Sequence, residues 1–205
     1  TIFPTQLAMA ASWDVDLLEQ VARVTAREMV TTGAHWTFSP VLCLTRDVRW
    51  GRTGETFGED PYLIGELGVA LIRGYQGKGL DDPTAVVATA KHYAGYSETQ
   101  GGRDASEADI SRRKLRSYFL PPFERAARAG AMMFMTGYQS MDGVPSTASK
   151  WLLREVLKDE WGFDGVVVSD WMATRSTVAS ANAGLDLIMP GPGGPWAQKL
   201  FDAVG

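Results

Sequence analysis

Short apolar runs alternate with helical patterns along most of the chain, and this alternation restricts the fold more than any other feature. The runs are apolar at every position rather than at every second one, as in strands with two buried faces. We expect five strands, at 36–44, 86–91, 131–135, 165–169 and 185–189. Apolar strands separated by helices form a parallel sheet with helices outside it, either an open doubly wound sheet or a β/α barrel.

Local start and stop signals indicate helices between these runs. Asp14 can cap a helix over 15–30, and Asp60 followed by Pro61 is a typical helix start. Further helices are expected at 111–120, 121–130, 150–161 and 172–184. No glycine-rich phosphate loop follows a strand, which argues against the nucleotide-binding open sheets and leaves the barrel as the favoured fold.

Polar residues stand where the apolar runs end. Lys91 and His92 follow "AVVATA", Tyr138 follows "AMMFMTG", and Asp170 and Trp171 follow "VVVS". The active site of a β/α barrel lies at the carboxyl ends of its strands. The sequence therefore predicts that these side chains meet at the mouth of a barrel.

Each of these positions also has a purely structural interpretation. Asp170 is a favoured residue for capping a helix over 172–184. Lys91 and His92 could close the barrel mouth with a salt bridge. Two adjacent cationic residues at the end of a buried strand are costly unless something polar faces them, which favours a functional site. His35, which precedes the first strand, is expected to be a core or rim residue.

Composition excludes several other classes of protein. The 205 residues carry a net charge of −4, which gives no reason to expect nucleic acid as a partner. One cysteine and two histidines cannot build a disulfide framework or a Cys- or His-rich metal site, so we expect no metal or cofactor. No stretch is apolar enough to insert in a membrane. Carboxylates, hydroxyl-binding donors and an aromatic side chain at strand ends are instead what a glycosidase needs.

Four motifs in order resemble one known family. They are "DVRWGRTGETFGEDPYL", "KHYAGYSETQGGRD", "MTGYQSMDGVP" and "WGFDGVVVSDW", spread over 47–171. Together they resemble the N-terminal barrel domain of family 3 glycoside hydrolases, in the bacterial β-glucosidase branch. The resemblance implies that 1–205 is part of a (β/α)8 TIM-type barrel, incomplete at both ends, because only five of eight strands are readable. It also implies a following α/β domain outside this chain, which carries the general acid/base.

The resemblance assigns a role to each matching residue. Asp170 corresponds to the nucleophile, which forms a covalent glycosyl-enzyme with retention of configuration. The residues that correspond to substrate-binding positions are Arg52, Lys91, His92, Tyr138 and Trp171.

Four residues near these motifs stay undecided. Glu55 is a possible site residue near Arg52, and Glu59 could pair with Arg52 or belong to a helix start. Arg103 and Asp104 either line the substrate entrance or pair with each other.

The implied function is that of a retaining β-glycosidase. It would remove terminal non-reducing β-D-glucosyl residues from β-linked glucosides or oligosaccharides, and the loop "GGRD" resembles those of periplasmic bacterial enzymes, which indicates a periplasmic or secreted protein. The loop after Lys91 and His92 lacks the histidine of the family's N-acetylglucosaminidases. A β-xylosidase or other exo-β-glycosidase, a non-catalytic sugar-binding relative, and an aldolase-like barrel with Lys91 as Schiff-base lysine remain alternatives.

Overall fold

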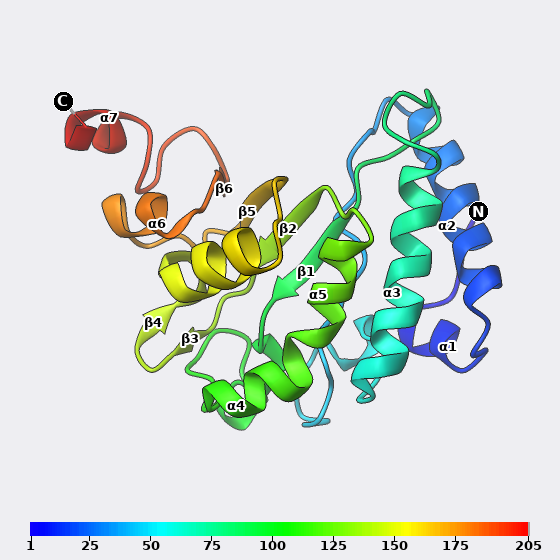
Figure 1. Ribbon diagram of the computed structural model, residues 1–205, viewed down its shortest axis with the longest axis horizontal. Helices are drawn as coiled ribbons and strands as arrows, with labels where there is room; N and C mark the ends of the chain where they lie inside the picture. The colour runs from blue at the N-terminus through cyan, green and yellow to red at the C-terminus, as the bar shows by residue number, and fades with distance from the viewer. Residues whose placement is uncertain (205) are drawn as a thin grey trace.

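The parallel sheet keeps its strands in chain order. A computed structural model describes residues 1–204, in which the sheet order is β1-β2-β5-β6 (Figure 1). The strands are β1 (Thr89–Tyr93), β2 (Met133–Thr136), β5 (Val166–Trp171) and β6 (Leu187–Met189). A doubly wound sheet reverses its strand order at a switch point, whereas a β/α barrel does not. The order confirms the barrel over the open sheet, and the four strands form an arc of it.

The expected strand over 36–44 is wrong as a continuous strand. This segment runs beside β1 and pairs with the chain there through separate bridges at Trp36–Val87 and Val41–Lys91, with one further hydrogen bond between them, from Thr89 N to Ser39 O at 2.9 Å. Pro40 has no N–H to donate, so the ladder is interrupted. Gln6, in α1 (Gln6–Ala10), pairs with Val41 in place of a strand: its amide donates to Val41 O and accepts from Val41 N, both at 2.9 Å.

Helices follow the capping signals closely. Asp14 accepts from Leu17 N at 2.9 Å, and Asp60 accepts from Leu63 N at 2.8 Å. The helices are α2 (Val15–Val30), α3 (Pro61–Gln76), α4 (Arg112–Lys114) with a π-type turn over Leu115–Phe119, α5 (Pro121–Arg128), a π-type helix over Trp151–Glu160, α6 (Val178–Ala183) and α7 (Gln198–Val204). A short hairpin of β3 (Ser140–Met141) and β4 (Val144–Pro145) follows β2. No helix within 1–204 combines the length and apolarity needed to cross a membrane.

The helix expected over 172–184 is shorter than predicted. It begins only at Val178, with Thr177 as the preceding residue, and ends at Ala183, followed by Gly184, whose φ of 102° is left-handed. The hydroxyl of the residue before it bonds elsewhere: Thr177 Oγ1 donates to Pro195 O at 2.5 Å. Ser and Thr compete in this way with helix formation. The interpretation of Asp170 as the cap of this helix is therefore wrong.

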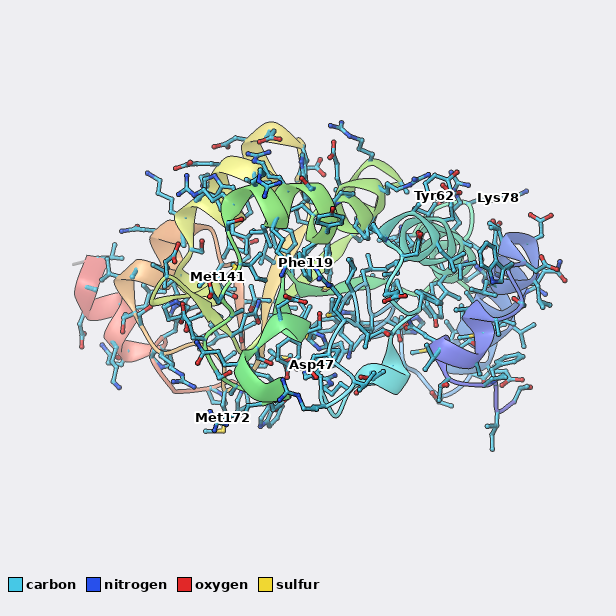
Figure 2. The ribbon with its side chains drawn as sticks, turned by 90° about the horizontal axis from the view of Figure 1, so that it is seen from below. Asp47, Tyr62, Lys78, Phe119, Met141 and Met172 are labelled. Carbon is cyan, nitrogen blue, oxygen red and sulfur yellow. The ribbon has the colours of Figure 1, made fainter. Side chains whose placement is uncertain are left out.

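The two faces of the sheet have different neighbours. Phe134 and Val167 belong to the main core, which they share with residues of α3, α5 and the helix Trp151–Glu160. Met133, Met135 and Val168 form a separate cluster on the opposite face. Figure 2 shows the helix Trp151–Glu160 along one edge of the molecule and Met172, just after β5, at the opposite edge. We call the helix-covered side the outer face and the other the inner face.

Strand register assigns the polar residues to the inner face. Lys91 is paired with Met135, and Met135 with Val168. Side chains alternate between faces along a strand, so Asp170, two residues after Val168, shares this face with Lys91. The register thus directs an amine and a carboxylate to the same side at the carboxyl ends of β1 and β5.

Candidate active site

Asp170 has an unpaired carboxylate oxygen in a buried position. It lies near the end of β5 with 9% of its surface exposed. Oδ1 accepts from the main-chain N–H of Trp171 at 2.6 Å, whereas Oδ2 is buried and has no hydrogen-bond partner among the described residues. Nε2 of His92 is 3.4 Å away, without the alignment of a hydrogen bond. A buried polar atom without a partner is destabilising, and such atoms are tolerated mainly where function requires them.

His92 is buried directly beside this oxygen. Burial, followed by the positive charges of Lys91 and Arg52, holds the pKa of His92 well below its usual value. The imidazole is therefore neutral near neutral pH. It can donate or accept a hydrogen bond, but it does not form the salt bridge that the structural interpretation of Lys91 and His92 required.

Lys91 is half-buried beside the same carboxylate. Burial and the charge of Arg52 lower the pKa of Lys91, while Glu55 and Asp170 act in the opposite direction. Its Nζ lies 6.0 Å from the centre of the Phe38 ring. An ammonium group that is partly removed from water makes stronger hydrogen bonds to a ligand than an exposed one.

Arg52 is fixed by a two-point ion pair. Its Nε and Nη2 donate to the two oxygens of Glu55 at 2.7 and 2.8 Å. This pairing lowers the pKa of Glu55. Glu59 is not the partner of Arg52, so that alternative is wrong. Glu55 orients the guanidinium, whose remaining N–H groups are available to a ligand.

Tyr96 is a residue of the site that sequence reasoning missed. Its buried ring packs edge-on against His92, with 5.0 Å between centroids, and against Trp50 and Tyr138 at 5.1 and 5.9 Å. Its hydroxyl donates to Asp104. Burial and this carboxylate raise the pKa of Tyr96. Tyr96 belongs to the same sequence motif as Lys91, which could have drawn attention to it. Its contacts with distant aromatic residues, however, cannot be inferred from the sequence.

Only one of the two charged residues of the "GGRD" loop contacts residues of the site. Asp104 accepts from Tyr96, so it does not merely pair with Arg103. Arg103 is exposed. Asp104 is thus connected to the aromatic cluster behind His92, whereas Arg103 has no such connection.

Two aromatic residues stand near the carboxylate. Tyr138 follows the end of β2, and Trp171 is the last residue of β5, directly after Asp170. Burial and the neighbouring Asp170 raise the pKa of Tyr138 to about 12, so its hydroxyl keeps its proton. Trp171 is 56% exposed, which leaves its indole accessible. Tryptophan faces are suited to the apolar side of a sugar ring.

Three other acidic residues near the site, Glu55, Glu98 and Asp104, are already engaged. Glu98 pairs with Lys114 at 2.6 Å and with Arg46 at 3.6 Å. Glu55 pairs with Arg52, and Asp104 accepts from Tyr96. Within 1–204, no three His, Cys, Asp or Glu side chains come together as a metal-binding group.

Comparison with known proteins agrees with this geometry. The model of the Glycosyl hydrolase family 3 N terminal domain matches residues 1–192. The chain belongs to glycoside hydrolase family 3. The family and the barrel fold inferred from the four motifs are thereby confirmed, and a family 3 barrel gives no support to the aldolase-like alternative.

Relatives within family 3 are β-glycosidases. A periplasmic beta-glucosidase of Salmonella typhimurium is 37% identical over 89% of this chain and 24% of its own length. A beta-xylosidase of Formosa agariphila is 44% identical over 83% of this chain and 24% of its own. A solved beta-glucosidase from intestinal bacteria, involved in saponin metabolism, is 50% identical with a TM-score of 0.90, over 98% of this chain and 28% of that one. The chain thus spans about a quarter of the length of these relatives.

Proposed function

We propose that this chain is the barrel part of a retaining β-glycosidase that removes terminal non-reducing β-D-glucosyl residues, with Asp170 as nucleophile. The observation that carries the proposal is the buried Oδ2 of Asp170, which has no hydrogen-bond partner in the described part of the chain and faces the inner side of the sheet beside Lys91 and His92. An oxygen without a hydrogen-bond partner keeps its lone pairs available for attack.

The reaction has two steps on one carboxylate. Asp170 attacks the anomeric carbon, forming a C–O bond to the enzyme while the glycosidic C–O bond breaks and the leaving oxygen takes a proton from a general acid. The same acid, now deprotonated, takes a proton from water, which releases the sugar from Asp170 with net retention. Lys91, His92 and Arg52 donate to sugar hydroxyls, and Trp171 offers its face to the ring.

The general acid/base comes, in this proposal, from a following α/β domain. Two observations support it. The chain spans about a quarter of its relatives' length, and three acidic residues near the site, Glu55, Glu98 and Asp104, are engaged in ion pairs or hydrogen bonds. That domain and a β-linked glucoside are the expected partners of the site.

Glucosides are favoured over xylosides as substrates. A beta-glucosidase from Listeria innocua, 39% identical with a TM-score of 0.89, has been solved in complex with glucose. The 44% identical beta-xylosidase keeps the xyloside alternative open. A periplasmic relative supports a periplasmic or secreted location.

Mechanism-based labelling tests the assignment of the nucleophile. The complete protein is incubated with 2-deoxy-2-fluoro-β-D-glucosyl fluoride, digested and sequenced by mass spectrometry. We expect a glucosyl label on the peptide of β5, at Asp170. Asp142→Asn, in the exposed β3–β4 turn, is the matched control and should label like wild type. A label on another residue contradicts the nucleophile, and turnover of aryl β-xylosides in preference to aryl β-glucosides contradicts the substrate.

A further inference from the structure

Cys43 is a buried group that the reaction does not use. It belongs to the segment 36–44 beside β1 and has 2% of its surface exposed. Its Sγ accepts the main-chain N–H of His92 at 3.3 Å, lies 3.7 Å from the ring Nδ1 of His92 and 3.8 Å from His92 O. One thiol therefore contacts three polar atoms of a single residue of the site.

The thiol of Cys43 keeps its proton. Burial raises the pKa of Cys43 to about 12, in spite of the neighbouring positive charges of Arg52 and Lys91. The sulfur already accepts one N–H, so its own hydrogen points to one of the two remaining contacts, Nδ1 or the carbonyl oxygen of His92. In the part of the chain that is described, the polar partner of Nδ1 is Sγ of Cys43.

The opposite ring nitrogen faces a carboxylate. Nε2 of His92 lies 3.4 Å from Oδ2 of Asp170. The neutral ring carries a single hydrogen, on one nitrogen or the other. A hydrogen on Nε2 is attracted by the carboxylate, whereas a bare lone pair there would be repelled by it. With the hydrogen on Nε2, Nδ1 is an acceptor, and an acceptor is what a protonated thiol at 3.7 Å requires.

We propose that Cys43 is a positioning residue for the glycosidase reaction: its thiol donates to Nδ1 of His92 and holds the ring as the tautomer that presents Nε2–H to the substrate. The inference rests on the proposed function for its kinetic consequence, but not for the tautomer itself. Such a partner behind an imidazole fixes both ring orientation and tautomer, as it does for metal-binding histidines. His92 then acts as a hydrogen-bond donor to sugar hydroxyls and not as a base.

Nitrogen NMR tests the tautomer directly. The complete protein is labelled with ¹⁵N-histidine, and the His92 signals are identified as those absent from His92→Phe. We expect the wild-type protein to show a proton on Nε2 and a bare Nδ1. Cys43→Ser keeps a donor and should keep this tautomer, whereas Cys43→Ala removes the donor and should give a mixture of both. A wild-type proton on Nδ1 overturns the proposal, even if no Cys43 variant folds.

Kinetics separate positioning from general packing. Loss of one ordinary hydrogen bond predicts that Cys43→Ala weakens inhibition by gluconolactone about five- to tenfold, while Cys43→Ser, which keeps a smaller hydroxyl donor in place of the thiol, stays within about threefold of wild type. If both variants lose the same affinity, or Ala keeps wild-type tautomer and affinity, Cys43 has only a packing role. If the wild-type protein hydrolyses no β-glycoside, the proposed function fails, and the NMR result still decides the tautomer.

Discussion

The outer and inner faces of the sheet are built from the same strands but differ in almost every property. On the outer face, Phe134 and Val167 are fully buried among residues of the covering helices. On the inner face, Met135 and Val168 are also buried, but the same face becomes charged at Lys91 and Asp170 as the strands end. Adjacent residues of one strand thus lie in different surroundings: the outer ones pack against helices, and the inner ones lead to the proposed site.

Within 1–204, most buried polar side-chain atoms without a hydrogen-bond partner lie near one end of the sheet. Buried side-chain atoms without a partner gather at or beyond the carboxyl ends of β2 and β5, and include Thr136 Oγ1, Gln139 Oε1, Asp170 Oδ2 and Thr174 Oγ1. Each lowers the stability of the folded state. A region that keeps several of them is organised for a ligand rather than for packing.

The largest expected effect comes from the inner face. Asp170→Asn should lower kcat for an aryl β-glucoside by at least about 10⁴-fold, because the amide cannot form the glycosyl ester. The thermal unfolding midpoint should stay the same or rise, because a buried and unpaired charge is removed. An active Asp170→Asn variant, or one that is inactive because it is unfolded, would contradict the conclusion that Asp170 serves the reaction and not stability.

A change on the outer face should have the reverse pattern. Phe134→Ala should lower the free energy of unfolding by about 3–5 kcal/mol through the cavity it leaves. Below the unfolding transition, KM for the same substrate should stay within about twofold, since Phe134 faces the helices. Denaturant unfolding and steady-state kinetics measure the two effects, with Met135→Leu on the inner face as a volume-conserving control expected to cost less than about 1.5 kcal/mol. Unchanged stability with impaired binding would show that the faces are not separate.

The hydrogen-bond donors of the inner face should contribute less than the nucleophile. Lys91→Met and His92→Phe should each weaken gluconolactone inhibition by about 1.5–3 kcal/mol, or about 10- to 150-fold, the range for hydrogen bonds that involve charged or buried partners. Lys158→Met removes a lysine that pairs with Asp186 on the outer side, and should leave inhibition unchanged. Wild-type affinity in both site variants would contradict the assignment of this region to sugar binding.

The smallest effect is a shift in the pH dependence of binding. The pKa of Lys91 is lowered, so its positive charge disappears as pH rises through a value below the usual 10.5. Competitive inhibition by glucose should therefore weaken in this alkaline range, and Lys91→Arg, which stays charged, should move that loss to higher pH. The stability contribution has the opposite sign, because between the lowered pKa and 10.5 the unfolded chain binds more protons and stability rises with pH. An identical alkaline limb in the arginine variant would exclude Lys91 as its origin.

Helix starts were predictable from the sequence, because they depend on residues that are close together in the chain. Asp14 and Asp60 cap helices as expected, because a cap involves neighbours within four residues. The polar residues after apolar runs also predicted that Lys91, His92 and Asp170 come together, since parallel strands end at the same edge. The break at Pro40 could have been predicted from its missing N–H, but the length of the apolar run outweighed it.

Contacts between distant segments could not be predicted in this way. Cys43 and His92 are 49 residues apart, and nothing in either motif indicates that they touch. The same holds for Tyr96, whose ring reaches Trp50 and Tyr138 from a different loop. Periodicity and capping describe each element separately, whereas these contacts depend on the curvature of the sheet that brings the elements together.

The amide of Gln6 has one further consequence, for association between molecules. It occupies both hydrogen-bonding groups of Val41, on the segment that borders β1. An edge with free N–H and C=O groups is a template on which another polypeptide can add a strand and begin aggregation. At Val41 both groups are already bonded to the Gln6 side chain, so this one position offers no free N–H or C=O to a strand of another molecule.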